Sequence, residues 1–392
     1  MQLKRFTLAL IILSLTLASA IAVQNMSSWE NTFDNLNHDV AGNVFVSDNV
    51  YVIGETGTNP YASDFLVIEY EKNGTQIRNF TIDNRNVDYG ESVFEENDSI
   101  YIVGTSTDNA WFGDTYCTFI KTDLEGNVDF TIEKNYSSKC YGLYLDDYAY
   151  LVGSTNDGAF VSKYSKEGIL VTETFYNASG KIISAEITYN ENIYVGAIIE
   201  GEDYTYHTLL NYNDNLSLIW ERTYNGGTCP IHEIDVETDS EGNIYLGTTV
   251  ENLELYSRLI AHNSSGDLLW DDVRAGEPQY DASGISVWNN RVYFVVSKMN
   301  NQGSYTGLDV LRYNSSGFIS IINDYDLIGL KGQGADADSQ GFVYGTGYTF
   351  GSDKDIQTIR FPLVFDELET DSSKITRLDK ERVKKAKSFI KQ

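Results

Sequence analysis

The sequence predicts an all-β fold, a seven-bladed β-propeller, and three observations lead to this prediction. One short apolar motif, usually containing Tyr and usually ending in Gly, occurs seven times in the 392 residues. Its copies are spaced by 44 to 51 residues, so near-equal units fill the chain. Each unit also carries turn residues at fixed places, which is typical of a four-stranded meander of about 49 residues.

Each copy of the motif predicts the second strand of a blade. Its residues are continuously apolar, as expected of a strand that packs on both faces against neighbouring blades. The seven copies lie at 50–54, 100–104, 149–153, 193–196, 244–247, 292–295 and 342–345. A first strand and a polar turn precede each copy. A variable polar segment, a third strand, a turn containing Gly or Asn and a fourth strand follow it.

The last unit is incomplete at its C-terminal end. After the third strand at 356–361 the chain reaches Pro362 without a glycine turn or a fourth strand. The segment Ser28–Phe33 resembles a fourth strand found elsewhere in the chain, Trp220–Tyr224. We therefore expect the strand around Trp29 to pair with the strand around Ile359 and to close the ring, which removes an open sheet edge. A linear solenoid with two free ends is the alternative.

The two ends of the chain differ from the repeats. Lys4 and Arg5 precede an apolar run that ends in small residues, so residues 1–22 are expected to be a secretory signal peptide; an uncleaved membrane anchor is the alternative. The propeller is expected over 23–363. Residues 364–392 form a basic tail that is expected to be helical or disordered. A solvated helix is the preferred interpretation, and contact with the acidic propeller or with a membrane surface or partner is the alternative. The protein is expected to be secreted or held at the cell surface.

The charge and the rare residue types exclude several kinds of function. A formal charge of -29 disfavours nucleic acid as a partner, because the protein and the phosphate backbone repel each other. Four His and three Cys leave little material for metal or triad chemistry, so no cofactor is expected beyond weak binding of divalent cations. The acidic segment 336–341 suits a hairpin turn better than a calcium loop. A closed ring is expected to be a monomer.

In an exported protein, two covalent modifications are expected: a disulfide bond and N-glycosylation. Cys117 and Cys140 are expected to lie in adjoining elements, where they could form a disulfide and leave Cys229 free; three reduced packing thiols are the alternative. Asn-x-Ser/Thr sequences predict N-glycosylation of a glycoprotein, although Asn also suits the turns where several of them fall. Besides Asn25, these sites are Asn73, Asn79, Asn97, Asn135, Asn177, Asn215, Asn263 and Asn314.

The repeat pattern resembles a known group of proteins. The segments 235–247 (DVETDSEGNIYLG) and 335–345 (ADADSQGFVYG) are similar to the secreted seven-bladed propeller repeats of bacteria and archaea, and the similarity covers residues 24–361. The resemblance implies a fold rather than one function, because such repeats serve adhesion, surface assembly, carbohydrate binding and some catalysis.

The segments between second and third strands predict a ligand face, because in a propeller they share one end with the links between blades. We expect long loops there, at 55–64, 105–116, 197–206, 248–257, 297–308 and 346–355. Their aromatic residues suit carbohydrate or protein ligands, although each ring could instead cap a blade edge. These residues are Tyr61, Trp111, Phe112, Tyr204, Tyr206, Tyr256, Tyr305, Tyr348 and Phe350.

The alternative function is a polysaccharide hydrolase or lyase. Such an enzyme needs carboxyl groups near the central mouth, and the sequence offers Asp88, Asp114, Asp281 and Asp336 as candidates. A binding or scaffold protein is the preferred interpretation, because no nucleophile elbow, phosphate loop or zinc-ligand spacing is present.

Overall fold

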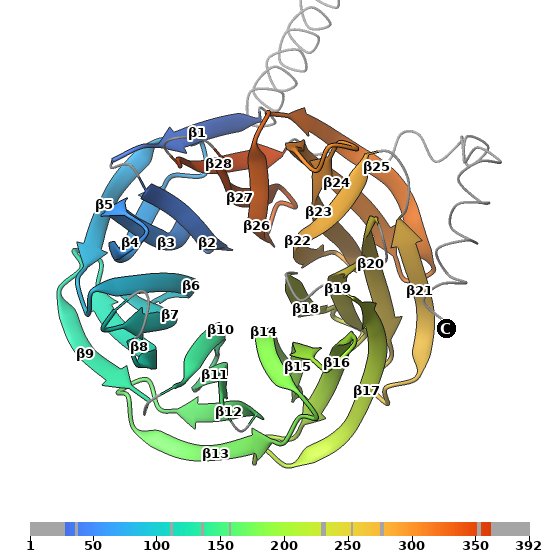
Figure 1. The fold of residues 1–392 in the computed structure, drawn as a ribbon, viewed down its shortest axis with the longest axis horizontal. Helices are drawn as coiled ribbons and strands as arrows, with labels where there is room; N and C mark the ends of the chain where they lie inside the picture. The colour runs from blue at the N-terminus through green and yellow to red at the C-terminus, as the bar shows by residue number, and fades with distance from the viewer. Residues whose placement is uncertain are drawn as a thin grey trace, which may run out of the picture.

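A computed structural model describes residues 28–35, 38–109, 113–134, 137–156, 158–228, 233–251, 254–274, 278–350 and 354–361. These residues form four-stranded antiparallel blades around a central axis, and the ring is closed (Figure 1). The seven-bladed propeller is therefore confirmed, and the solenoid is excluded. Among these residues no helix is long and apolar enough to cross a membrane. The expected signal peptide and basic tail lie outside the described residues.

Seven inner strands surround the axis: β2 (His38–Val46), β6 (Val87–Glu96), β10 (Lys139–Leu145), β14 (Lys181–Asn190), β18 (Ile234–Thr238), β22 (Gln279–Trp288) and β26 (Leu330–Ala337). The second strands are β3 (Val50–Asn59), β7 (Ser99–Thr107), β11 (Ala149–Thr155), β15 (Asn192–Glu200), β19 (Ile244–Glu251), β23 (Arg291–Met299) and β27 (Val343–Thr349).

The third strands are β4 (Ala62–Tyr70), β8 (Thr115–Asp123), β12 (Gly158–Tyr164), β16 (Thr205–Tyr212), β20 (Leu255–His262), β24 (Tyr305–Asn314) and β28 (Ile356–Phe361). The outer strands are β5 (Gln76–Ile82), β9 (Val128–Glu133), β13 (Leu170–Tyr176), β17 (Leu218–Gly227), β21 (Leu268–Arg274), β25 (Gly317–Asp326) and β1 (Trp29–Phe33).

Burial follows the position of a strand in its blade. In β7, eight consecutive residues are buried, because both faces of the strand pack on neighbouring blades. The outer strand β9 of the same blade alternates between exposed and half-buried residues, since only one of its faces meets another blade. The motif strands therefore hold most of the core, and clusters of their apolar side chains fill the spaces between blades.

The N-terminal strand closes the ring as the sequence predicts. β1 pairs antiparallel with β28, with Trp29 opposite Arg360 and Phe33 opposite Ile356. Trp29 also reaches the first blade, where its indole Nε1 donates a hydrogen bond of 2.9 Å to the Lys72 carbonyl oxygen. The last blade therefore contains both ends of the propeller chain and is tied to the first blade by the same strand.

An aromatic ring of one blade repeatedly packs on a turn of the next. Gly74 and Gly266 have positive φ angles, and a Cβ atom at either position would lie within 3 Å of the ring of Trp29 or Trp220. These glycines are needed both for the backbone conformation of the turn and for the close approach of the ring. The contact explains why Trp recurs on fourth strands and why Gly recurs on the turn between the third and fourth strands of the next blade.

Four of the segments expected to be long loops, 55–64, 197–206, 248–257 and 297–308, are mostly strand, which corrects their prediction. The segments 105–116 and 346–355 keep longer connections, between Thr107 and Thr115 and between Thr349 and Ile356. β3 continues to Asn59 and β4 begins at Ala62, so two residues connect them. Several polar residues of these segments are threonines, whose β-branched side chains favour strands. Their hydroxyl groups can form hydrogen bonds at the ends of the strands. Thr249, for example, is buried and donates a hydrogen bond of 2.7 Å to Asp281.

Candidate functional site

The central channel is the main concave feature of the described residues. Six of the seven inner strands carry a β-bulge at the same level, which leaves one residue of each strand outside the pairing with the second strand. A bulge turns the extra side chain away from the ladder. The bulge residues line the channel, and they are Gly42, Glu91, Tyr141, Ile183, Ser283 and Gln333.

The first cavity in the channel, here called the upper cavity, opens toward the links between blades and has a volume of ≈ 370 Å³. Its lining includes Tyr89, Tyr141 and Tyr348, the carboxyl groups of Glu55, Glu91 and Glu233, and the amine of Lys331. The Lys331 Nζ lies 3.1 Å from Glu233 Oε1. Burial alone would lower the pKa of Lys331, but Glu233 and Asp281 outweigh it and raise that pKa.

Two acidic residues of the upper cavity differ in their surroundings. Glu55 is held by a buried network, because His38 Nε2 lies 3.1 Å from one of its oxygens and Ser63 donates a 2.7 Å hydrogen bond to the other. Burial, together with the charge of Glu233, raises the pKa of Glu91 to about 8. Glu91 is therefore largely protonated at neutral pH, whereas Glu233 forms an ion pair with Lys331.

The second cavity, here called the lower cavity, lies toward the turns between first and second strands and has a volume of ≈ 410 Å³. Between the two lies a space of ≈ 50 Å³ whose lining includes residues of both. One side of the lower cavity carries the rings of Phe45, Phe94 and Tyr144, whose neighbouring centroids are 4.5 and 5.9 Å apart. The other side carries the carboxyl groups of Glu186, Asp235, Glu237 and Asp336. Glu95 and Glu96 of β6 also line the cavity, on the same side as the rings.

The carboxyl groups of the lower cavity join inner strands of adjacent blades. Asp336 accepts hydrogen bonds of 2.7 Å from the backbone N–H groups of Val46 and Ala337. Asp235 likewise accepts a hydrogen bond from the backbone N–H group of Ile285. Burial raises the pKa of Asp235 to about 6 and that of Asp336 to about 7, in spite of these hydrogen bonds. Burial and then Asp235 raise the pKa values of Glu186 and Glu237 as well.

Three of the aromatic residues expected on the ligand face come together at the rim of the upper cavity. Phe350 is 50% exposed and lies parallel to the Tyr305 ring, with centroids 5.6 Å apart. Its ring centroid is 5.1 Å from that of Tyr348, which lines the cavity. The Lys354 Nζ lies 5.0 Å from the Tyr348 centroid. The rings therefore lead from the cavity wall at Tyr348 to the protein surface at Phe350.

The remaining aromatic candidates do not join this rim. Tyr61 and Tyr204 are about half exposed in their own blades, at 51% and 48%. Tyr206 packs against the core, and Tyr256 hydrogen-bonds Glu254 in its own connection. Trp111 and Phe112 lie outside the described residues.

The structure does not bring the four candidate catalytic carboxylates together. Asp336 lines the lower cavity, and the other three line none of the described channel cavities. Asp281 accepts hydrogen bonds from the hydroxyls of Thr249 and Tyr305 and so joins two blades. Asp114 is exposed at the end of its connection. Of the four candidates, Asp336 is therefore the one that the described residues place in a channel cavity.

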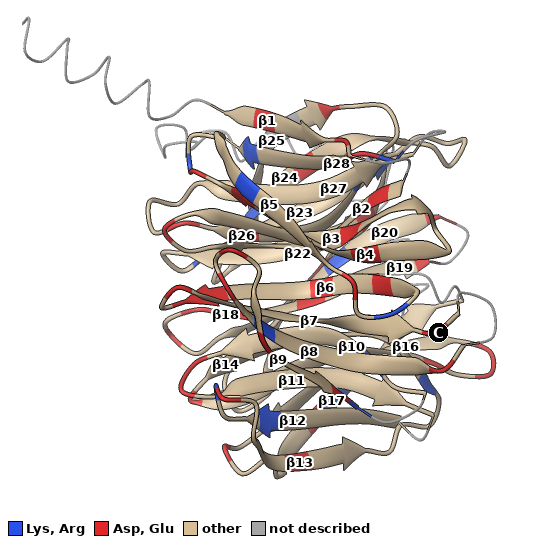
Figure 2. Ribbon diagram, turned by 90° about the vertical axis from the view of Figure 1, so that its left-hand side faces the viewer, with Lys and Arg blue, Asp and Glu red and all other residues tan. Residues whose placement is uncertain are grey.

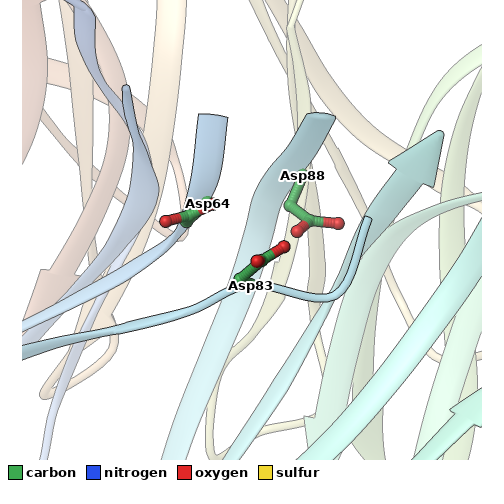
Figure 3. Close-up of side chains that lie close together, drawn as sticks. All are labelled: Asp64, Asp83 and Asp88. Carbon is green, nitrogen blue, oxygen red and sulfur yellow. The ribbon is translucent and has the colours of Figure 1, made fainter. Parts of the chain in front are cut away.

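Asp88 belongs to a different group of carboxylates (Figure 3). The group contains Asp64 in β4, Asp83 in the link between β5 and β6, and Asp88 in β6. One carboxylate oxygen of each residue lies within 4.8 Å of the other two. Asp88 is fully buried, and burial raises its pKa to about 6. These oxygens are of the type that Ca²⁺ or Mg²⁺ prefers, so this trio is where the described residues could hold a divalent cation.

Asp336 and Ala337 end β26, and residues 338–341 form the turn that follows. Asp338 accepts hydrogen bonds from the backbone N–H groups of Gln340 and Phe342 and from the Tyr344 hydroxyl, at 2.9 to 3.1 Å. Both of its carboxylate oxygens are thereby used within the hairpin. Asp239 makes the equivalent contacts two blades earlier.

Cys117 and Cys140 form a disulfide, with Cα atoms 4.6 Å apart. Both half-cystines are buried, and they join the third strand of one blade to the inner strand of the next. Cys229 lies outside the described residues. Among the candidate glycosylation sites, Asn135 also lies outside them. Half-buried sites are Asn263 and Asn314, and exposed ones are Asn73, Asn79, Asn97, Asn177 and Asn215.

The site residues that sequence reasoning missed are those of the channel. Glu91, Glu186, Glu237 and Lys331 stand in ordinary polar contexts, and nothing in their immediate neighbours distinguishes them from surface residues. For Glu91 the position relative to the repeat is a usable signal, because each bulge residue precedes the Tyr of its motif by 9 to 11 residues.

No protein-family model matches the chain, and no curated protein matches it. Several solved structures share its fold. A catalytically inactive virginiamycin B lyase from Staphylococcus aureus, determined with quinupristin, is similar with a TM-score of 0.57 and 11% identity, covering 86% of this chain and 99% of that one.

Two further structures are similar at the same level. YCF48 from Cyanidioschyzon merolae has a TM-score of 0.52 and 11% identity, covering 85% of this chain and 98% of that one. YCF48 bound to D1 peptide has a TM-score of 0.53 and 10% identity, with coverages of 86% and 97%. These similarities confirm the fold-level resemblance: the chain has the β-propeller fold, which in known proteins serves both binding and catalysis.

Proposed function

We propose that this protein is an exported binding propeller that takes a carbohydrate at the mouth of the upper cavity. The observation that carries the proposal is that the aromatic rings at the rim of the upper cavity contact a residue that lines the cavity itself. Tyr348 lines the upper cavity and contacts Phe350, which is half exposed and lies parallel to Tyr305. Sugar rings stack on aromatic faces, and their hydroxyls need hydrogen-bond partners nearby.

The upper cavity supplies such partners. Ser184 and Gln333 offer a hydroxyl and an amide, and Glu233 offers a carboxylate held by Lys331. The inner strands that carry these groups belong to different blades of a closed ring, so the groups keep fixed positions without rearrangement. A preformed polar site next to an aromatic platform favours a rigid binding role.

Export and surface location are part of the proposal and rest on the N-terminal sequence. Residues 1–22 have the layout of a secretory signal, and the described ring carries several exposed Asn-x-Ser/Thr sites. N-terminal sequencing of the protein recovered outside its cells should begin after Ala20 or Ala22. Recovery of an intact residue 1 at a membrane would favour the retained anchor.

Glycan-array binding by the full chain tests the ligand class. Glycans bound by the wild type should lose about tenfold in affinity with Tyr348→Ala or Phe350→Ala, since each substitution removes one face of the platform. Phe175→Ala is the matched control, because Phe175 is 62% exposed on the outer strand β13, far from the axis. Equal losses in all three variants, or no bound glycan, would contradict a carbohydrate site at this rim.

A protein ligand at the same mouth is the other outcome of this test. One structural neighbour is described with a bound peptide, and a propeller mouth of this size can admit an extended segment. If no glycan binds, crosslinking of the exported chain on intact cells should capture a partner with the wild type and with Phe175→Ala, and fail with Tyr348→Ala.

A second candidate function, a polysaccharide-acting enzyme, rests on Glu91. Its pKa of about 8 keeps the carboxyl group protonated at neutral pH, which is the state a general acid requires. Turnover of an array-positive sugar that is lost in Glu91→Gln, while binding persists, would support catalysis. Binding without turnover in the wild type would remove this candidate.

A further inference from the structure

The lower cavity has a composition that the proposed function does not use. Three aromatic rings, those of Phe45, Phe94 and Tyr144, come from consecutive blades and form one side of a space of ≈ 410 Å³. The carboxyl groups of Glu186, Asp235, Glu237 and Asp336 come from the other side of the ring. Glu95 and Glu96 also line the cavity, on the aromatic side, and Glu96 pairs with Lys166, which lies outside the lining. None of the described residues that line this cavity is Lys or Arg.

The four carboxyl groups opposite the rings influence one another, and no Lys or Arg stands among the described residues that line the cavity. Burial raises the pKa values of Glu186 and Glu237 most; the charge of Asp235 raises both further, and the charge of Asp336 also raises that of Glu237. A positive group placed among them would therefore be favoured by each of them, and the cavity walls would shield the interaction from solvent.

The geometry disfavours a metal ion as that positive group. Within the described residues, the set of acidic side chains whose ligand atoms approach within 4.8 Å is Asp64, Asp83 and Asp88, which lies elsewhere. Asp235 and Asp336 each direct both oxygens at backbone N–H groups, which fixes the two carboxylates on their own strands while each oxygen keeps a second acceptor site. Carboxylates fixed apart from one another suit a cation with several donors pointing in different directions.

An amine at the end of an apolar stem matches both sides of the cavity. A primary ammonium has three donors on one atom, and it can contact separate carboxylates, whereas a planar guanidinium matches one carboxylate side by side. Methylene groups would lie along the rings of Phe45 and Phe94, whose faces also attract a cation. We propose that the lower cavity is a binding site for an alkylammonium group, carried by a free polyamine or by a lysine side chain of a partner protein.

This site is independent of the proposed carbohydrate site. The two cavities open toward opposite ends of the channel, and the residues named for one are not those named for the other. Loss of glycan binding would leave the ammonium site intact, and loss of ammonium binding would leave the glycan site intact.

Calorimetric titration of the full chain near pH 8 tests the proposal. 1,5-Diaminopentane and a short peptide containing one lysine are the two probes, and 1-pentanol is the uncharged control. One molecule of either amine should bind per chain at physiological salt, and 1-pentanol should show at least tenfold weaker binding. Tighter binding of the peptide would assign the site to a partner's lysine, and tighter binding of the diamine would assign it to a free polyamine.

Variants distinguish a built site from general attraction to an acidic surface. Glu237→Gln should weaken amine binding about tenfold, because it removes a charge from the cavity but keeps the shape of the side chain. Glu125→Gln is the matched control: Glu125 is exposed on a turn at the same end of the ring and should leave the affinity unchanged. Phe94→Leu should weaken binding of both probes and provides a second variant if Glu237→Gln unfolds.

Three results would overturn the proposal. One is absence of saturable binding of both amines at physiological salt. Another is an equal effect of Glu125→Gln and Glu237→Gln, which would show that the net charge of the protein attracts the amines without a site. The third is equal binding of 1-pentanol and the diamine, which would make the cavity an apolar pocket.

Discussion

The Trp29 indole Nε1 donates a 2.9 Å hydrogen bond to the Lys72 carbonyl oxygen, and this contact joins the closing strand of the last blade to a turn of the first. Arg360 donates to the same carbonyl oxygen at 3.0 Å. The ring is therefore closed by pairing of β1 with β28 and also by a contact between blades. Closure removes two free sheet edges, which a seven-bladed array would otherwise expose.

Trp29→Ala should destabilise the folded ring by about 2 to 4 kcal/mol, because it removes a half-buried ring and its hydrogen bond. Urea unfolding measures this change. Trp270→Ala is the matched control, since Trp270 donates an equivalent 2.9 Å hydrogen bond to Ser315 within the continuous part of the chain. Only Trp29→Ala should also speed proteolysis at β1, and equal protection of β1 in both variants would contradict a closing role.

Gly74→Ala should destabilise the protein by about 2 to 4 kcal/mol. The φ angle at Gly74 is 93°, and a Cβ atom would lie 2.7 Å from the Trp29 ring, so both backbone and packing oppose the change. Gly303→Ala separates the two effects, because Gly303 has a φ of 77° and nothing lies within 4 Å of its Cβ position. Thermal unfolding should show a loss of about 1 kcal/mol for Gly303→Ala. Equal losses would show that the ring contact contributes nothing.

The stability of the ring should rise as the pH is lowered from about 8 to about 5. Burial raises the pKa values of Glu91, Asp235 and Asp336 to about 8, 6 and 7, whereas carboxyl groups of an unfolded chain titrate near 4. The folded state therefore binds more protons than the unfolded state across this range, and lowering the pH favours it. Asp123 and Glu133 have lowered pKa values, so they titrate below this range and do not oppose the effect there. Burial lowers the pKa of His262, which opposes the effect, but this single group is outnumbered by the three carboxyl groups.

Urea midpoints at several pH values measure this dependence. Glu91→Gln should flatten the upper part of the curve, because the group that titrates near pH 8 is removed. A wild-type midpoint that is higher at pH 8 than at pH 5 would show that these carboxyl groups are better solvated or better paired than the structure indicates.

Removal of the disulfide should lower stability by about 2 to 4 kcal/mol. The bond closes a loop between residues 23 positions apart, and the unfolded chain gains conformational freedom when that loop is opened. The double substitution Cys117→Ala with Cys140→Ala tests this by thermal unfolding. Reductant should shift the midpoint of the wild type toward that of the double variant and leave the double variant unchanged. A reductant effect on both would point to another thiol.

The acidic charge has more than one structural role. Figure 2 shows Asp and Glu positions distributed over the whole stack of strands, with fewer Lys and Arg among them. Asp239 and Asp338 order hairpin turns, while Asp235 and Asp336 connect inner strands of neighbouring blades. The sequence shows the excess of acid, but only the contacts separate carboxylates that hold the fold from those that face the channel.

The architecture follows from the repeat alone, because a propeller uses one local pattern in every blade. Each apolar motif with its glycine turn specifies a blade through near-neighbour interactions, and the incomplete last unit with Trp29 at the other end specifies the closure. Tertiary structure decided the site. The bulges that aim Glu91 and Tyr141 into the channel leave no composition signal, and the charged sides of both cavities combine residues from blades far apart in sequence. Local patterns encode strands and turns, whereas burial, raised pKa values and the meeting of Tyr305 with Phe350 arise only when the ring closes.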